Sequence, residues 1–510
     1  MMRKIKLYII LAAIVVSASA CLDKYPSDGI PEKKAMTTVE EANQVVIGIY
    51  SAYKDAALYS GDLTLLPDLQ SDLVYAVEGY SNAYGDIWRW NILATNTDIT
   101  DVYGQLYAVI GRCNFFLENI EQVENNTTDD DKLEKLDSYK GEVYFARALA
   151  YSELIKMYCK AYKPETADKE LGVALIDSYS NAGRPKRASL KASYQFVLDD
   201  LAKASNYLDT EEKGSDPVYN SIYFTIGAVN SLYARVYLYM QEWQKAADYS
   251  TKVIDSKDYI LSAVTKKTYS NDYNDYEYMW QYDASTEIIW KVGFEITSYG
   301  GRLGKIFFNY DYNSYKPDYV PGKWALNLYA ANDNRYEAFF GNATTGYPHG
   351  LTCPLLIKYY GNQNFFKNNI LHVNMPKPFR LSEQYLIRAE AYCQLANLGT
   401  VPTGYSKAGK DITILRTARY KTYGGSTVIT SDNWLKMIEE ERVKELFMEG
   451  FRLNDLKRWE KGFERSAQLN TIPQGNTLKV KASDPLFVWP IPQHELQSPN
   501  ADIEPNESNK

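Results

Sequence analysis

The sequence of 510 residues contains only three histidines and five cysteines, and this scarcity removes several classes of function. The histidines lie far apart, and we expect each of them to be structural. No H-E-x-x-H zinc motif, G-x-S-x-G nucleophile motif or phosphate-binding loop is present. The cysteines form no C-x-x-C pair. Acids are too numerous, at 64, for any one carboxylate pair to indicate a glycosidase. We therefore predict neither catalytic residues, nor a metal site, nor a cofactor.

The chain also lacks an excess of positive charge. Its formal net charge is −8, and removal of an N-terminal segment that carries Arg3, Lys4 and Lys6 would make it −11. An acidic exterior repels phosphate backbones and other polyanions. We therefore exclude nucleic acid as a partner.

Long apolar runs are absent apart from one near the N-terminus. Residues 1–20 have a basic start, an apolar stretch and a small-residue end, which is typical of a secretory signal peptide. Cys21 follows Ala18-Ser19-Ala20 and resembles the lipid-modified cysteine of a bacterial lipobox, although Ala18 replaces the usual leucine. Residues 21–36 then read as a lipidated tether to a membrane. The alternative is ordinary cleavage after Ala20, which leaves a free thiol.

Helical periodicity dominates two regions, about 37–260 and 376–460. A capping box at Thr38 predicts a helix that runs to about Ala57, and further helices are expected over 101–120, 136–158 and 193–208. Small and aromatic residues over 231–255 and 385–419 resemble tetratricopeptide helical pairs. Generic helix hairpins are the alternative for each pair.

Residues 261–375 lose this periodicity and are rich in tyrosine, asparagine and glycine. We predict an irregular, loop-rich subdomain here, with short strands at 287–294 and 353–359, followed by a C-terminal segment over 461–510. Long irregular segments within an ordered domain are usually functional.

Residues 437–459 combine apolar positions at helical spacing with many charges of both signs. We expect a helix capped by Ser431, a break at Gly450 and a second short helix. Glu441 and Glu445 could pair with arginines in the interior, so this stretch is interpreted as structural rather than catalytic.

The same stretch resembles the C-terminal signature of the SusD/RagB family, the outer-membrane nutrient-binding lipoproteins of Bacteroidetes. Further strings that resemble the family follow in order along the chain: 40–50, 69–72, L-Y-x-x-I-x-x-C-N at 106–114, Y-x-x-x-D-x-R at 329–335, 379–392, and W-P-I-P at 489–492. The last residues depart, since Glu504-Pro505-Asn506 stands where the family often ends differently. The resemblance implies a mostly α fold with irregular helical pairs, a single SusD-like domain over 37–510, and partnership with a SusC-type TonB-dependent transporter at the cell surface.

Tyrosine is the outlier of the composition, with 45 residues, and it suggests where a ligand could bind. A sugar ring lays its apolar face on an aromatic ring, while amides and charged groups bind its hydroxyls. Two stretches, 75–90 and 269–319, offer both, and the resemblance implies that their loops form the binding platform. The predicted ligand-binding residues are Asn82, Tyr84, Trp88, Trp90, Trp280, Tyr299 and Tyr312. Trp88 and Trp90 would share one face if extended, and both could be buried instead.

The predicted function is therefore capture of oligo- or polysaccharide and its delivery to the transporter. Two alternatives stay open: binding of peptides, for which an acidic aromatic groove would also serve, and a scaffold that only docks the transporter.

Overall fold

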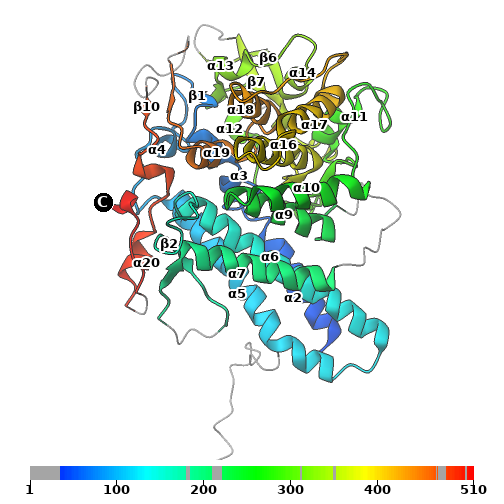
Figure 1. The fold of residues 1–510 in the computed structure, drawn as a ribbon, viewed down its shortest axis with the longest axis vertical. Helices are drawn as coiled ribbons and strands as arrows, with labels where there is room; N and C mark the ends of the chain where they lie inside the picture. Colours follow the sequence, from blue (N-terminus) through cyan, green and yellow to red (C-terminus); the bar gives the residue numbers. More distant parts are fainter. Residues whose placement is uncertain are drawn as a thin grey trace, which may run out of the picture.

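The protein is described by a computed structural model that covers residues 35–179, 184–208, 221–310, 313–347, 352–466, 468, 478–499 and 502–510. The described part is mostly helical with a few small sheets, which confirms the predicted fold class (Figure 1). The predicted signal peptide and Cys21 lie outside these residues. Within them, no helix is long and apolar enough to cross a membrane.

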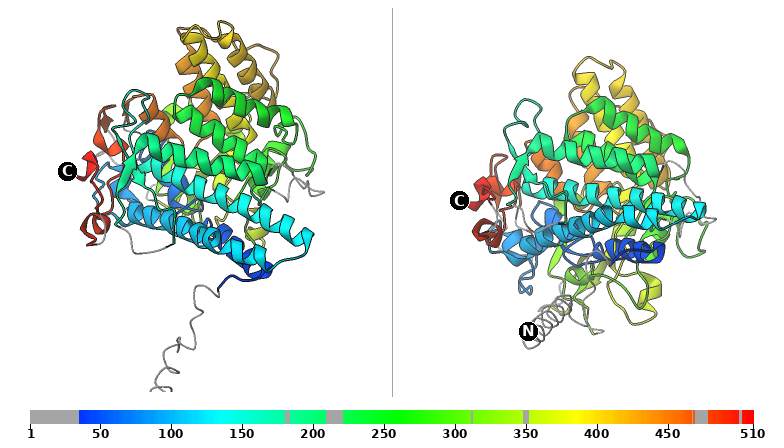
Figure 2. Two further views of the ribbon diagram at one scale, coloured as in Figure 1. Left: turned by 60° about the horizontal axis from the view of Figure 1, so that its bottom comes forward. Right: turned by 90° about the horizontal axis from the view of Figure 1, so that it is seen from below.

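The long helices form a layered stack, from α2 and α5 at one end to α16 and α17 at the other (Figure 2). In order, α5 packs on α6, α6 on α7, α7 on α9, α9 on α10, α10 on α16 and α16 on α17. Local sequence therefore sets most of the stack, since consecutive helices are also spatial neighbours. The bounds are α2 (Val39–Ala52), α5 (Thr97–Asn125), α6 (Asp130–Tyr158), α7 (Leu190–Tyr207), α9 (Ile226–Tyr239), α10 (Trp243–Ser256), α16 (Leu381–Asn397) and α17 (Gly404–Arg419).

Side-chain caps define where several of these helices begin. The Thr38–Glu41 capping box is present, and it starts α2 as predicted, although the helix ends at Ala52 rather than near Ala57. Asn96 and Ser189 cap α5 and α7 in the same way, each accepting a hydrogen bond from a backbone N–H. The structure thus starts α5 and α7 a few residues earlier than their apolar periodicity indicates.

The two predicted helical pairs are α9–α10 and α16–α17, and they pack on each other. Ala234 of α9, Ala246 of α10 and Ala391 of α16 meet in one small buried cluster. Small side chains allow this close approach of the helices. A second cluster joins Ala389 to Ala408 between α16 and α17. The residues singled out for the repeat therefore lie at the interfaces between helices.

Residues 261–375 contain only short elements, as predicted. The expected strand at 287–294 is reduced to three residues, and the one at 353–359 ends at Leu356 before a turn of 3₁₀-helix. These elements are α11 (Asp275–Tyr282), β4 (Ile288–Trp290), α12 (Lys305–Phe308), β5 (Tyr319–Pro321), α13 (Lys323–Leu326), α14 (Arg335–Phe339), β6 (Phe340–Thr344), β7 (Thr352–Leu356), η3 (Ile357–Tyr359) and α15 (Gln363–Phe366).

Two-stranded sheets join this segment to distant parts of the chain. The N-terminal strand β1 (Val74–Ala76) pairs antiparallel with β5, and β8 (Phe379–Arg380) pairs with β4. The first pairing brings the loop after β1 against the irregular segment. The other short elements are α3 (Asp62–Leu69), α4 (Gly85–Trp88), β2 (Leu171–Ala174), β3 (Arg187–Ser189), α18 (Trp434–Glu445), α19 (Arg452–Arg458), β9 (Phe463–Glu464), β10 (Lys479–Val480), η4 (Pro485–Phe487), α20 (Gln493–Gln497) and η5 (Glu507–Asn509).

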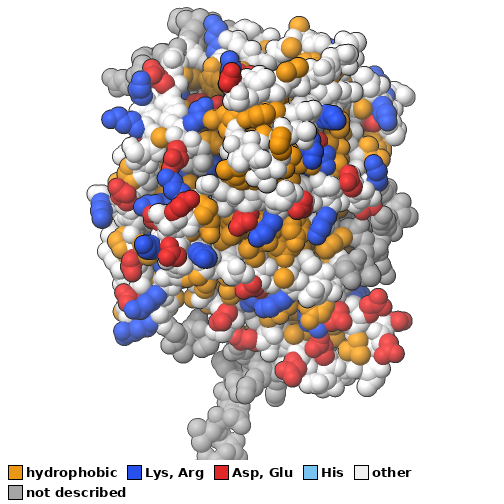
Figure 3. Space-filling view, in the orientation of Figure 1, with side chains coloured by type: hydrophobic (Ala, Val, Ile, Leu, Met, Phe, Trp, Pro, Cys, Tyr) orange, Lys and Arg blue, Asp and Glu red, His pale blue; other side chains and the backbone are white. Residues whose placement is uncertain are grey.

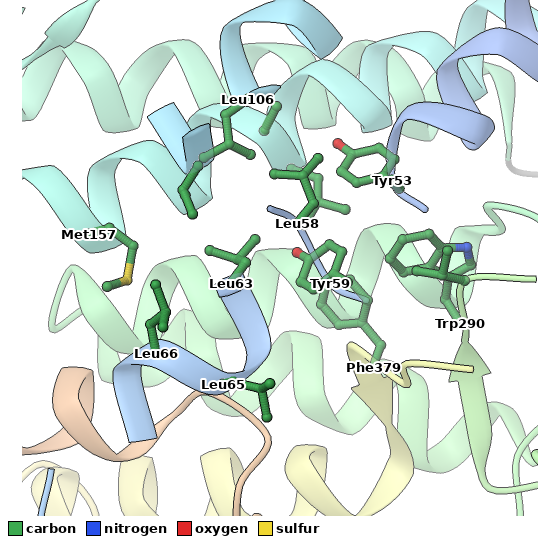
Figure 4. Close-up of a cluster of buried hydrophobic side chains, with 14 of the residues drawn as sticks. Tyr53, Leu58, Tyr59, Leu63, Leu65, Leu66, Leu106, Met157, Trp290 and Phe379 are labelled. Atoms are coloured by element: carbon green, nitrogen blue, oxygen red, sulfur yellow. The ribbon is translucent and has the colours of Figure 1, made fainter. Parts of the chain in front are cut away.

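The largest apolar cluster extends through most of the described fold, and Figure 4 shows its part around α3 and the neighbouring helices. Tyr53 and Tyr59 stack with ring centroids 5.8 Å apart, and Trp290 contacts both rings edge-on. The Tyr59 hydroxyl donates to Glu153 Oε1 at 3.0 Å, so even this core tyrosine has its polar end satisfied. Many of the 45 tyrosines are therefore core residues.

A buried ionic cluster surrounds Glu445 at the end of α18. Its Oε1 accepts hydrogen bonds from Arg380 Nη1 at 3.0 Å and Arg419 Nη2 at 2.9 Å. Arg335 Nη1 donates to Oε2 at 3.2 Å, and the four side chains are at most 1% exposed. This agrees with the structural interpretation of residues 437–459. The helix start is a correction, because α18 begins at Trp434 and Ser431 forms no cap.

Candidate functional site: an aromatic surface on the irregular segment

Trp88 and Trp90 lie in the core, which corrects their assignment as ligand-binding residues. Trp88 is 0% exposed and Trp90 is 9% exposed. Their indole N–H groups donate to the backbone oxygens of Val74 at 3.2 Å and Gln70 at 2.6 Å. Both rings therefore point into the interior, which was the alternative given for them from the sequence. Arg89, between them in the sequence, reaches solvent.

Trp280 is also buried, with 2% of its surface exposed, so its predicted contact with a ligand at the surface is wrong. Three cations lie over its ring: Lys358 Nζ at 4.2 Å, Lys377 Nζ at 4.8 Å and Arg380 at 5.2 Å from the ring centroid. These cation–π contacts stabilise buried positive charge beside the ionic cluster. The ring lines a small interior cavity rather than an open platform.

The other predicted residues of the 75–90 stretch lie near the surface, in a loop that is held in one conformation. Asn82 is exposed, and its Oδ1 accepts from Tyr80 Oη at 2.9 Å and Arg89 Nη1 at 2.8 Å. Tyr84 is half-buried. Its hydroxyl hydrogen-bonds Asp62, whose pKa burial raises to about 7. Asn82 and Tyr84 both have positive φ, so the turn is tight.

A second set of rings lies on the irregular segment, and we call Tyr310, Tyr315, Tyr360 and Phe366 the aromatic patch. All four are half-buried. Tyr310 stacks on Tyr315 with centroids 4.7 Å apart and planes 26° apart. The Tyr315 and Tyr360 hydroxyls are 3.4 Å apart, and Tyr360 lies 5.4 Å from Phe366. The four rings form a continuous row.

A rigid floor supports this row. Phe308 at the end of α12 stacks on His372, with ring centroids 5.3 Å apart and planes 6° apart. His372 Nδ1 lies 3.2 Å from the Tyr360 carbonyl oxygen. Burial lowers the pKa of His372, which keeps the imidazole neutral and suited to stacking. Phe308 also contacts Tyr315 and Tyr360 edge-on, so two of the patch rings rest directly on the core.

The loop around Asn82 and the aromatic patch belong to one continuous surface. Ser81 N donates to Asp318 Oδ1 at 2.7 Å, and Tyr347 Oη donates to the Pro317 carbonyl at 2.8 Å. Tyr347 is half-buried and its ring faces Gly79. Residues 315–319 therefore run from the patch to the loop, with Tyr347 between them. Such an extended, shallow surface suits a chain-like ligand better than a small molecule, which needs a deep cavity.

Two predicted residues remain. Tyr299 is 36% exposed, and its ring packs edge-on against Phe365, the neighbour of Phe366, so it lies beside the patch. Tyr312 lies outside the described residues. The sequence reasoning missed Tyr347, Tyr360 and Phe366 as site residues. In the sequence, only their position in a loop-rich segment pointed to a role in binding. Tyr359 lies in the same segment and is buried, so this position does not distinguish surface rings from core rings.

Among the described residues, no group of three or more histidine, cysteine or acidic side chains could hold a metal ion. The patch consists of four half-buried rings, and the amides of Asn309 and Asn364 lie within two residues of Tyr310 and Phe366 along the chain. This arrangement is a candidate binding surface on a helical scaffold.

Comparisons with known families agree with this class. A model described as "Starch-binding associating with outer membrane" matches residues 22–238, and the SusD family model matches residues 304–506. The chain therefore belongs to the SusD family. It resembles "SusD-like protein P2" of Formosa agariphila, at 21% identity over 99% of both chains. The members of this family are binding proteins rather than enzymes, and they associate with the outer membrane.

Solved structures share the fold. A SusD superfamily protein from Bacteroides thetaiotaomicron superposes with a TM-score of 0.75 at 23% identity, over 92% of this chain and 99% of the other. A "laminarin binding SusD-like protein" superposes with a TM-score of 0.66 at 20% identity, over 92% and 100%. These likenesses confirm the arrangement of the helices.

Proposed function

We propose that this protein captures oligo- or polysaccharide on the aromatic patch and the adjoining loop around Asn82. The continuous row from Tyr310 to Phe366 carries the proposal, because a row of ring faces matches the repeating apolar faces of a glycan chain. The starch-binding description of the family model and the laminarin-binding relative support the same ligand class.

Delivery of the glycan to a SusC-type TonB-dependent transporter completes the proposal. The chain would be held at the outer surface of the outer membrane by lipid on Cys21. Copurification of a large barrel protein with the full-length chain tests the partnership. Globomycin-sensitive processing and loss of membrane association in Cys21→Ala test the anchor.

Affinity electrophoresis and calorimetry against a panel of polysaccharides, laminarin included, test the binding itself. Tyr315 lies in the middle of the row, so Tyr315→Ala should abolish most of the affinity. Tyr179→Ala is the matched control, because Tyr179 is 43% exposed and packs on Phe115 of α5, in a different part of the fold. Equal affinity of both variants for every glycan would contradict the proposed site.

Binding of digested peptides with no response to any glycan would favour the peptide alternative. Copurification with the transporter, and no binding of glycan or peptide, would favour the docking scaffold. Both results are distinguishable from a folding defect by circular dichroism of the same samples.

A further inference from the structure

The segments that build the aromatic patch differ in charge from the rest of the chain. Residues 302–310, 313–318 and 357–372 contain five lysines or arginines and a single acid, Asp318, which is only 3% exposed and lies near Lys305, although the chain has 64 acids in 510 residues. Asp311 lies outside the described residues. Elsewhere acids dominate, and they gather visibly at the tip where α5 meets α6 (Figure 3). The patch is therefore a local basic site on an acidic protein.

Four of these cations are exposed: Arg302, Lys305, Lys316 and Lys367. Within the described ranges none of them forms an ion pair with a carboxylate. The fifth, Lys358, is buried and pairs with Glu449 at 2.6 Å, so it contributes to the core. Cations that stabilise a fold usually have such partners, whereas these four keep their charge available to a ligand.

The cations are tied to the rings by the packing of the backbone. Lys367 directly follows Phe366, and the Cε atom of Lys316 lies against Gly346, which donates a backbone hydrogen bond to Tyr315. A Cβ on Gly304 would lie 1.8 Å from the Tyr359 carbonyl oxygen. Glycine at this position therefore lets the segment that carries Lys305 pack against Tyr359, which directly precedes Tyr360. The cations therefore stand on the same backbone segments as the rings, or on segments packed against them.

From this arrangement we propose that the aromatic patch prefers anionic glycans, whose sugars carry a carboxylate or a sulfate ester. Ring faces hold the apolar side of each sugar, and the unpaired cations bind its anionic group. The acidic remainder of the surface repels long polyanions at low ionic strength, and salt screens it beyond about 8 Å. Short acidic fragments are therefore the expected ligands, because they can bind the local cations without extending over the acidic surface. This inference rests on the proposed function and adds its substrate class.

Two matched pairs of short oligosaccharides test it: oligogalacturonate against its methyl-esterified form, and sulfated dextran oligosaccharides against the unsulfated ones. Members of each pair share a backbone and differ in charge. Affinity should be higher for the charged member of at least one pair, and the pair that responds identifies the anionic group. Higher ionic strength should reduce this preference.

The double variant Lys305→Gln/Lys316→Gln locates the effect, with Lys132→Gln/Lys436→Gln as a control of equal net charge. The control lysines are 49% and 77% exposed and lie on α6 and α18. Each exposed charge contact is worth roughly a 1.5- to 5-fold change in affinity. The test variant should therefore lose about 5-fold in affinity for the charged oligosaccharide, and the control variant should lose none.

Equal losses in the two double variants would overturn the inference, because the preference would then follow net charge alone. Binding of neutral members only, still abolished by Tyr315→Ala, would also overturn it and leave the proposed function standing. No binding to any glycan of the wider panel would instead overturn the proposed function itself.

Discussion

Replacing Glu445 by glutamine tests the buried ionic cluster, because it removes one charge without changing the shape of the side chain. The carboxylate receives hydrogen bonds from three arginines, and a glutamine amide must turn its NH₂ group toward at least one of those donors. Each hydrogen bond to a charged group contributes about 1.5–3 kcal/mol, and removing one member of a buried ion pair costs about 3–5 kcal/mol. We expect Glu445→Gln to lower the free energy of unfolding by about 4 kcal/mol.

Glu440→Gln is the matched control, since it makes the same chemical change on the same helix. Glu440 is 32% exposed and its only ion pair is with Lys436 at 3.8 Å among the described residues, so its loss should cost less than about 0.5 kcal/mol. Denaturant unfolding, followed by far-UV circular dichroism, gives the midpoint and slope for each variant. Similar midpoints for the two variants would refute the reasoning. If Glu445→Gln yields no folded protein while Glu440→Gln folds normally, the cluster is again confirmed as essential.

Burial alone would raise the pKa of Glu441 and Glu445, but the arginines around them outweigh it and hold each pKa well below the usual value of 4.5. Carboxyls with lowered pKa contribute stability that is present above about pH 4.5 and lost as the pH falls further, so thermal unfolding scans should show the melting temperature dropping steeply below that pH. Trp88→Phe changes a core residue, so it should lower the melting temperature and leave the glycan Kd of the folded protein unchanged. Calorimetry below the unfolding transition measures this Kd, and a weaker Kd would indicate that Trp88 contacts the glycan directly.

Local signals predicted the helical framework well. The Thr38 capping box and the contact of Ala389 with Ala408 are local, and the structure places both as predicted. Ala391 instead packs on α9 and α10, which lie far away in the sequence. The boundary at Ser431 was wrong because several polar residues near a helix start compete for the cap. Asn433 takes that position without accepting from a helix N–H, and its Oδ1 accepts from Thr430 N at 2.8 Å instead.

The strings that resemble the family predicted the family, yet their residues build the scaffold rather than the ligand site. Arg335, Arg380 and Glu445 come from three different strings and meet in one buried cluster. Trp489 of the W-P-I-P string donates its indole N–H to Gln70 Oε1 at 2.8 Å in the core. A signature made of buried ionic and aromatic contacts identifies a fold and cannot specify which glycan binds.

The sequence by itself determined the helical pairs, the family and the predominance of tyrosine. Periodicity and caps depend on residues close together in the chain, and composition needs no structure at all. Only the tertiary structure decided which rings meet solvent. Trp88 and Tyr315 are both large aromatic residues in irregular stretches, and their exposure depends on contacts with strands and loops far away in the chain. Pairing of β1 with β5 seals the first inside, while the floor of Phe308 and His372 presents the second at the surface.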